Sequence, residues 1–296
     1  MPAPKIMLLF GVLAVMLVFF GAIVGVLVGN MLVFMSIFFA IAITMNVVSY
    51  YKSDSIMLRL TKTKIISRDE NPRFYDLVKK VSETAGLPMP KVGIMQSSVP
   101  NAFATGRDKN HAVVVATGSI LAMLNDDELE GVVGHEISHV THRDILVSTV
   151  AATIATIISY IGNIIIISEL FGGINNRNNN AGLLLILSAI LIPLGATFVR
   201  LGISRSREAY ADTGSVELVK KPAALISALQ KISKPLRQPI AAQKRNSSPV
   251  PSAYSSLFIV NNFGGGALLK LFSTHPSLEA RVKNITETAK RLGLSI

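Results

Sequence analysis

Three of the chain's five histidines lie in one short stretch, GVVGHEISHVTHRD, and a glutamate directly follows the first of them. On a helix His135 and His139 stand one turn apart, so that two imidazoles can reach one divalent ion. Glu136, beside them, is placed to accept a proton from a water molecule that attacks a carbonyl. The residue types and their H-E-x-x-H spacing therefore predict a zinc site with hydrolytic chemistry.

The position of Glu136 on the helix favours this prediction over the plainer alternative that the polar residues are merely solvated. At about 100° per residue, Glu136 falls within the apolar arc of the helix, where an unpaired carboxylate is costly. Gly131 and Gly134 lie on the histidine side, which leaves room for something close to the backbone. His142 shares that side but lies about 10 Å along the axis from His135, so we expect it at the helix end and not on the same ion.

A catalytic zinc site needs a third protein ligand and an open position for water. The chain has no cysteine, so the ligand must be His, Asp or Glu, and the remaining histidines, His111 and His275, are isolated. Glu208 and Asp212, in SRSREAYADTGS, stand one helical turn apart. One of them can bind the ion while the other accepts the ring N–H of a histidine ligand. The alternative is a surface charge cluster in which Glu208 pairs with one of the two arginines just before it.

The elements that would position these residues can be read from periodicity and capping. The histidine motif is predicted to lie on a helix over residues 126–144, capped by Asn125 with Glu128 in a capping box. Residues 71–88, NPRFYDLVKKVSETAGLP, predict an amphipathic helix. Its apolar face holds Phe74, Leu77, Val78 and Val81. Two β-branched runs, KVGIMQ and HAVVVATG, predict strands. We expect HAVVVATG to present an edge on which an extended substrate adds, with an interior strand as the alternative.

Two long uncharged segments near the N-terminus are predicted to cross a membrane. Ile6–Gly29 and Met31–Tyr51 each exceed the roughly 20 residues that a helix needs to span a bilayer. They predict a transmembrane hairpin over residues 1–51. A cleaved signal peptide is the alternative for the first segment, but its apolar run is too long and a second span follows at once.

Residues 145–203 hold two further uncharged segments around a polar, turn-rich stretch, and they predict a second transmembrane hairpin. A buried helical hairpin of a soluble fold is the alternative. The protease domain is then split into a first soluble part, residues 52–144, and a second, residues 204–296. Within the second part, residues 234–255 are rich in Pro, Ser and Gln, and we expect a mobile loop there.

Composition and charge agree with a membrane protein. Hydrophobic residues make up 50% of the 296 residues and charged residues only 16%, yet the net charge is +11. Lysines and arginines follow the second uncharged segment closely, from Lys52 on, whereas the tip between the first two segments is uncharged. The positive-inside rule therefore places both termini and the site in the cytoplasm. Tryptophan is absent and the basic residues gather beside the apolar segments, so we expect a lipid bilayer and no nucleic acid as a partner.

Four motifs in this order resemble the HtpX family: NAFATG, HEISH, SREAYAD and THPSLEAR. These are membrane zinc endopeptidases of the bacterial and archaeal cytoplasmic membrane, related to the CAAX prenyl proteases and associated with membrane-protein quality control under stress. The resemblance covers nearly the whole chain. It implies a mainly α membrane protein, in which transmembrane helices carry a zincin-like α+β cytoplasmic metalloprotease domain with a small β-sheet. It also implies protein substrates, membrane proteins among them.

The resemblance assigns roles to individual residues as well. It implies that His135, His139 and Glu208 bind one zinc ion per subunit and that Glu136 is the general base. It implies a supporting role for Asp212, on the ring of His135. Residues that match the family's other motifs and lie near the reacting carbonyl, or support the site, are Asn101, His275 and Arg281.

A metal-stabilised membrane scaffold or chaperone without proteolysis is the alternative function. Its zinc site would be closed by a fourth protein ligand, His142 or His275, and would leave no position for water.

Overall fold

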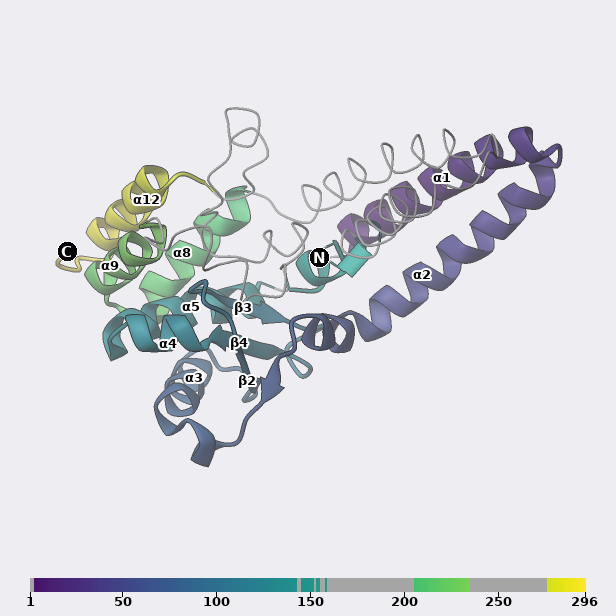
Figure 1. The fold of residues 1–296 in the computed structure, drawn as a ribbon. Helices are drawn as coiled ribbons and strands as arrows, with labels where there is room; N and C mark the ends of the chain where they lie inside the picture. The colour runs from purple at the N-terminus through teal and green to yellow at the C-terminus, as the bar shows by residue number, and fades with distance from the viewer. Residues whose placement is uncertain (1–2, 143–144, 152, 155–157, 159–204, 235–275) are drawn as a thin grey trace.

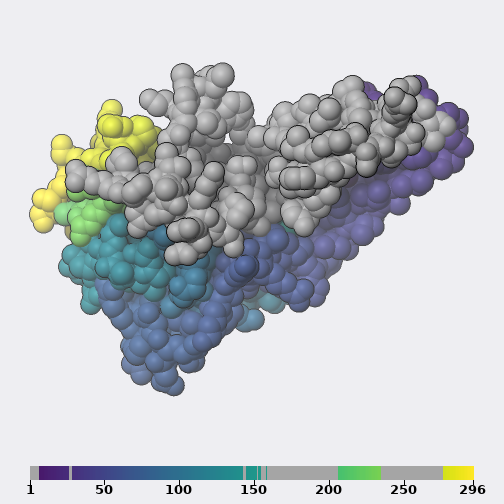
Figure 2. Space-filling model, viewed as in Figure 1, coloured from purple at the N-terminus to yellow at the C-terminus, as the bar shows by residue number. Residues whose placement is uncertain are grey.

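The computed structural model describes residues 3–142, 145–151, 153–154, 158, 205–234 and 276–296. Two long N-terminal helices form a hairpin that projects from a body of helices around a small sheet (Figure 1). Figure 2 shows the same shape in space-filling form, with the purple hairpin extending away from the blue and teal body. The predicted combination of apolar helices and a small sheet is confirmed.

The hairpin consists of α1 (Ala3–Val28) and α2 (Met31–Leu60). Both are long and apolar enough to cross a bilayer, as predicted for the N-terminal segments. Gly29 forms the tip with a φ of +83°, a value that favours glycine. Just before the tip the helices touch closely, because a Cβ on Gly25 would lie 2.5 Å from the Cα of Met31.

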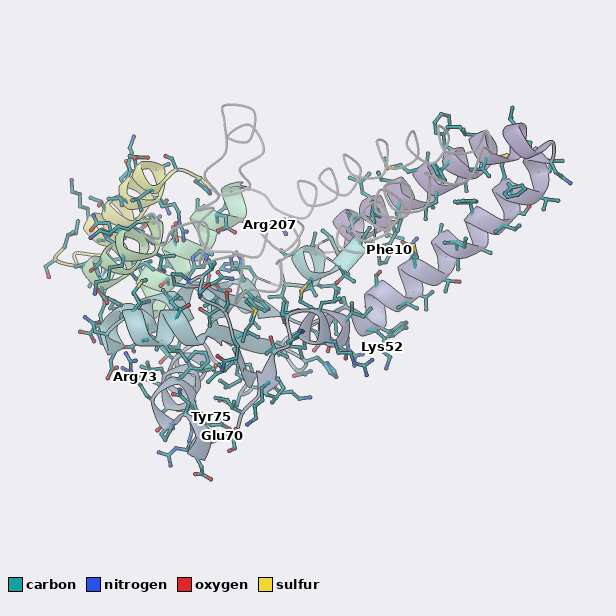
Figure 3. All side chains as sticks on the ribbon, in the orientation of Figure 1. Phe10, Lys52, Glu70, Arg73, Tyr75 and Arg207 are labelled. Carbon is teal, nitrogen blue, oxygen red and sulfur yellow. The ribbon has the colours of Figure 1, made fainter. Side chains whose placement is uncertain are left out.

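Helix α2 does not end at Tyr51, the last residue of the uncharged segment. It continues past Tyr51 to Leu60, and its last turns pack on the sheet. Lys52 marks the start of the charged part, where α2 enters the body (Figure 3). Met57 is fully buried in a cluster with sheet residues, among them Phe103 and Val115. The helix is therefore unbroken at the predicted boundary, residue 51, and joins the apolar hairpin to the sheet without a linker.

The sheet has four strands in the order β1-β2-β4-β3. These are β1 (Lys64–Ile65), β2 (Lys91–Met95), β3 (Ala102–Thr105) and β4 (Val113–Thr117). Strand β4 pairs in parallel with β2 and antiparallel with β3. The prediction that HAVVVATG presents an edge is thus wrong, since β4 has neighbours on both sides and all five of its residues are buried. Among the described strands the edge on that side is β3.

Helices cover one face of the sheet and the end of α2 covers the other. On the helical face lie α3 (Pro72–Thr84) and α5 (Asp126–Thr141), in one core with the sheet residues Val114 and Ala116. The predicted amphipathic helix is confirmed as α3, with Phe74 and Val78 fully buried. Short helices η1 (Arg68–Glu70) and α4 (Gly118–Met123) complete this part of the body.

Helix α5 carries the histidine motif through the centre of the body. Its start is as predicted, because Asn125 and Glu128 form both hydrogen bonds of a capping box. It ends at Thr141 with His142 as the C-cap, and residues 143–144 lie outside the described residues. Two helices from the second half of the chain pack on it, α8 (Arg205–Val219) and α9 (Pro222–Ser233), and α12 (Leu278–Arg291) packs on those two in turn.

The chain after α5 turns back towards the hairpin. Residues 145–151 are helical, and Leu146 and Val150 pack with Leu9 and Leu13 of α1. Most of the predicted second hairpin lies outside the described residues, as does the predicted loop 234–255 from residue 235 on.

Candidate metal centre

Small residues let α5 and α8 pack closely enough to share a site. A Cβ on Gly134 would lie 2.8 Å from Ser215 Oγ, and a Cβ on Gly214 only 2.1 Å from Ser138 Oγ. Ser215 Oγ also donates a hydrogen bond of 2.7 Å to the carbonyl of Gly131. The room predicted beside Gly131 and Gly134 is therefore occupied by neighbouring helices. This contact brings the carboxylates of α8 onto the histidines of α5.

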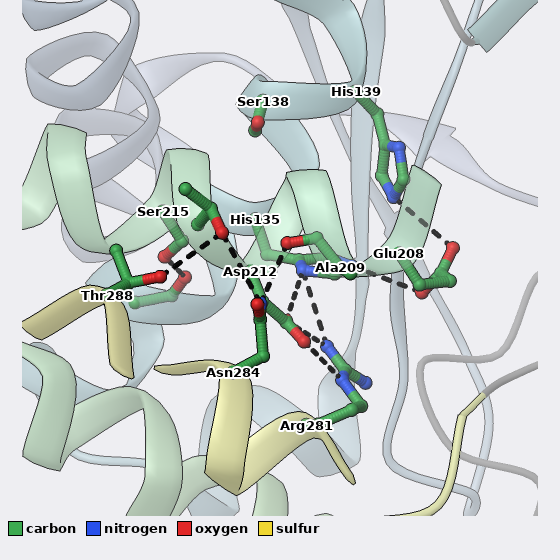
Figure 4. Close-up of polar contacts among 12 residues, drawn as sticks. His135, Ser138, His139, Glu208, Ala209, Asp212, Ser215, Arg281, Asn284 and Thr288 are labelled. Atoms are coloured by element: carbon green, nitrogen blue, oxygen red, sulfur yellow. Dashed lines mark hydrogen bonds and ion pairs between the residues drawn. The ribbon is translucent and has the colours of Figure 1, made fainter. Parts of the chain in front are cut away.

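His135, His139 and Glu208 converge (Figure 4). Each histidine Nε2 lies 3.6 Å from a different oxygen of the Glu208 carboxylate. The two rings stand nearly perpendicular, with centroids 4.9 Å apart. One ligand atom from each residue lies within 4.8 Å of the others, and within the described part of the chain this is the one such group of three. Two imidazoles and one carboxylate fit the donor set of a catalytic zinc ion.

Asp212 and Arg281 hold the far side of the His135 ring. His135 Nδ1 lies 2.9 Å from Asp212 Oδ1, and Arg281 binds both oxygens of that carboxylate, at 2.6 and 2.9 Å. Burial would raise the pKa of Asp212, but the charge and hydrogen bonds of Arg281 and the bond to His135 outweigh it and lower the pKa. Asp212 is therefore a charged carboxylate that keeps a proton on His135 Nδ1. The other ring nitrogen of His135, Nε2, faces Glu208.

The site attracts positive charge. Burial disfavours a protonated His135, but hydrogen bonds to Asp212 and Glu208 outweigh it and raise the pKa of the imidazole to about 9. In the metal-free protein at neutral pH, His135 therefore carries an extra proton. The carboxylates of Asp212 and Glu208 stabilise this proton, and the same negative charge would stabilise a divalent cation bound by the two histidines and Glu208.

Glu136 is held by the edge strand of the sheet. Its Oε2 accepts a hydrogen bond of 2.7 Å from the backbone N–H of Ala104 in β3. The side chain is buried, and this burial raises the pKa of its carboxyl group, with the neighbouring histidines acting in the opposite direction. One oxygen is thus fixed by the sheet, and the group has a raised affinity for a proton.

The other predicted site residues lie in several places. Asn101 is buried directly before β3, where its backbone N–H donates to Thr117 Oγ1 at 2.9 Å. His275 lies outside the described residues. His142 is exposed at the end of α5, with Nδ1 2.7 Å from the carbonyl of Ser138, as expected for a helix-end residue. His111 is exposed and bonded to Asp108.

Two contributors were not anticipated from the sequence. Ala104 supplies only a backbone N–H, which every residue except proline has, so its type gives no signal. Ser215 follows Asp212 by three residues, on the same side of the α8 helix, and a small residue at that spacing is a weak sign of close helix packing.

Known proteins resemble this chain over most of its length. Residues 68–289 match Peptidase family M48. A "Protease HtpX homolog" from Pyrococcus furiosus is 43% identical over 262 residues, 88% of each chain. Homologues of the same name from Trichormus variabilis and Persephonella marina are 42% and 38% identical, over 85% and 98% of this chain and 86% and 98% of theirs. The crystal structure of S. mikatae Ste24p is only loosely similar, with a TM-score of 0.40 and 16% identity over 91% of this chain and 61% of its own.

The family match spans most of the chain, and relatives named for HtpX match it from end to end. The chain therefore belongs to peptidase family M48, among the HtpX homologues.

Proposed function

We propose that this chain is a membrane-bound zinc endopeptidase that cleaves membrane or misfolded proteins at the cytoplasmic face of the cell membrane. The observation that carries the proposal is the convergence of His135, His139 and Glu208, with the Glu136 carboxyl group close enough to interact electrostatically with all three. These residues come from two helices separated by some seventy positions, and the family supplies the reaction class.

His135, His139 and Glu208 would hold the zinc ion, with the His135 ring oriented by Asp212 and Arg281. When bound, zinc polarises the scissile carbonyl and makes water a better nucleophile at neutral pH. Three protein ligands leave a position open for that water. A closed structural site would need a fourth ligand. Of the two candidates, His142 is exposed at the end of α5 and is not in the group of three, and His275 lies outside the described residues.

Glu136 would act as the general base. The Ala104 N–H holds Oε2, so Oε1 would receive the proton of the attacking water and pass it to the leaving amine. The raised pKa of this buried carboxyl group suits a residue that must both take and release a proton near neutral pH. Asn101 and His275 would hydrogen-bond the oxygen of the carbonyl as negative charge develops on it.

The substrate would lie along β3 and not along β4. Strand β3 is the edge on this side of the described sheet and follows Asn101 directly. An extended peptide that adds to such an edge gains backbone hydrogen bonds without regard to its sequence. The Ala104 N–H points from this edge to Glu136, which would bring a peptide lying there next to the general base.

The membrane hairpin would place the site at the cytoplasmic surface. Exposed Tyr50 and Tyr51 stand where the apolar part of α2 ends, as aromatic residues do at a membrane interface, and Lys52 and Arg59 follow on the body side. The body would then lie in the cytoplasm with both termini.

The substitution Glu136→Gln tests the proposal in detergent-purified protein. The variant should bind one zinc ion per chain, as the wild type does, and cleave an unfolded test protein at least about a hundredfold more slowly, because it loses a general base. Metal content and cleavage, each with and without chelator, are measured together. Cleavage at the wild-type rate would remove Glu136 as the base. A wild-type protein that binds zinc but cleaves nothing would support the scaffold alternative.

A further inference from the structure

The C-terminal helix α12 runs beside α8 and presents a row of polar side chains to it. Arg281, Asn284 and Thr288 follow one another at helical spacing and contact α8 (Figure 4). Arg281 binds Asp212, as described above. Arg291, one turn further on, lies 3.5 Å from Glu217 at the exposed end of the row. Polar contacts thus join the two helices over about three turns of α12.

Asn284 contacts α8 at the turn that carries Glu208. Its amide Nδ2 donates to the backbone carbonyl of Ala209 at 2.9 Å and lies 3.4 Å from Thr213 Oγ1. Ala209 is the residue directly after Glu208. The bond is therefore made to the backbone directly beside the Cα atom from which the Glu208 side chain extends.

The turn that carries Glu208 lies at one end of the described part of α8, which begins at Arg205. The packing contacts of Ser215 and Gly214 with α5 lie about two turns further along α8. Closer to Glu208, the Asn284 side chain binds the α8 backbone from outside the helix.

We infer that Asn284 is a positioning residue for the metal centre: its amide holds the α8 backbone beside Glu208 and thereby the direction of the Glu208 carboxylate. This rests on the proposed zinc site. The amide itself touches neither the three ligand side chains nor Glu136. Its loss should therefore change the affinity and geometry of the metal site and leave substrate binding unchanged.

Asn284→Leu removes the amide at similar volume and adds no charge, and Thr288→Val is its matched control. Thr288 lies in the same row, where its hydroxyl is 3.3 Å from Thr213 Oγ1, but it makes no bond to the Ala209 carbonyl. We expect Asn284→Leu to raise the zinc dissociation constant about tenfold, at the lower end of what loss of an outer hydrogen-bond partner costs a metal site. Thr288→Val should leave it within about twofold, since the ligand-bearing turn stays fixed.

The full-length proteins are compared in detergent by chelator competition for zinc and by the visible absorption of the cobalt-substituted site, which reports ligand geometry. In Asn284→Leu the cobalt spectrum should shift and kcat should fall, with KM unchanged. If Asn284→Leu does not fold, Asn284→Ala removes the same amide and should show the same shifts.

Equal zinc affinities in all variants, or the same loss in Asn284→Leu and Thr288→Val, would show that α12 contributes packing alone and would overturn the inference. If the wild-type protein itself binds no zinc, the proposed function fails, and this inference fails with it. The wild-type measurement thus separates the two failures.

Discussion

At the scale of single residues, the site is a series of side chains in which groups of opposite charge lie next to each other. Arg281 faces Asp212, Asp212 faces His135, and His135 faces Glu208, all of them buried. Each buried charge is tolerated because the next one compensates for it. Removing one member should therefore affect both the metal site and the stability of the fold.

Substituting Asp212→Asn should weaken zinc binding or activity by about 10–100-fold, because the His135 ring loses the carboxylate that orients it. The same change leaves Arg281 buried without its partner, so the metal-free protein should also unfold at lower temperature. Chelator competition gives the first effect and circular dichroism the second, since the chain has no tryptophan for fluorescence. Asp54→Asn, at a half-buried carboxylate outside the site, is the control. Unchanged zinc affinity in Asp212→Asn would mean that Asp212 does not orient the ring.

The sequence was informative about the zinc ligands because local geometry relates them. His135 and His139 are one turn apart, and Glu208 could be paired with them from its own helical spacing to Asp212. In contrast, the contact between Asp212 and Arg281 joins two helices, and only family resemblance pointed to Arg281. The Ala104 N–H that holds Glu136 could not be predicted, because its role depends on where β3 lies and not on the side chain of residue 104.

At the scale of elements, the contact between α5 and α8 decides whether the ligands meet. Gly134 and Gly214 are the points of closest approach, where a side chain would force the helices apart. Glycine is normally unfavourable inside a helix, by about 1 kcal/mol relative to alanine. Its presence in α5 is accounted for by this contact, which offsets the loss of helix propensity.

The substitution Gly134→Ala tests whether helix propensity or close packing decides stability at this position. Helix propensity alone would stabilise the variant by about 1 kcal/mol, whereas forcing a Cβ against Val219 and Ser215 should cost about 1–3 kcal/mol. We expect net destabilisation together with weaker zinc binding, because α8 carries Glu208 away from the histidines. Gly11→Ala is the matched control, since nothing lies within 4 Å of a Cβ on that helical glycine. A Gly134→Ala variant that is more stable and binds zinc normally would contradict the close-contact account.

Elements were predictable where a strong period or a cap defined them. The amphipathic period gave α3, and the capping box gave the start of α5. Strand β3 was missed because Ala102–Thr105 is only four residues long, includes two alanines and has no alternation of exposed and buried positions. The edge was assigned to β4 for the same reason, because the strand that covers β4 had not been identified.

At the scale of the whole molecule, the chain must hold together two parts that the segment 145–203 separates. Two buried glutamates in the first turns of α5 make this connection. Glu128 binds Ser227 and Lys231 of α9. Glu130 lies between Lys80 of α3 and Lys221 just before α9, at 2.6 and 2.7 Å. These ion pairs link both parts of the body at the end of α5 that lies away from the histidines.

The Glu130 pairs predict how stability depends on pH. Burial would raise the pKa of Glu130, but hydrogen bonds and charges from Lys221 and Lys80 outweigh it and lower the pKa below its ordinary 4.5. A carboxyl group with a lowered pKa in the folded state stabilises the fold fully above its unfolded-state pKa. That contribution is lost as the pH falls through the folded-state value. The metal-free protein should therefore lose stability below about pH 4.5, even where the zinc site plays no part.

Substituting Glu130→Gln isolates this contribution from the other carboxylates. At pH 7 the variant should be less stable by about 1–3 kcal/mol, because it loses charged hydrogen bonds, although the half-exposed lysines are readily hydrated again. Its deficit relative to the wild type should shrink as the pH falls below about 4.5, since the wild-type group is then protonated too. Thermal unfolding of the metal-free proteins across this pH range measures the deficit, with exposed Glu287→Gln as the control. A deficit that stays constant with pH would mean that Glu130 contributes packing and not charge to the junction between the two parts.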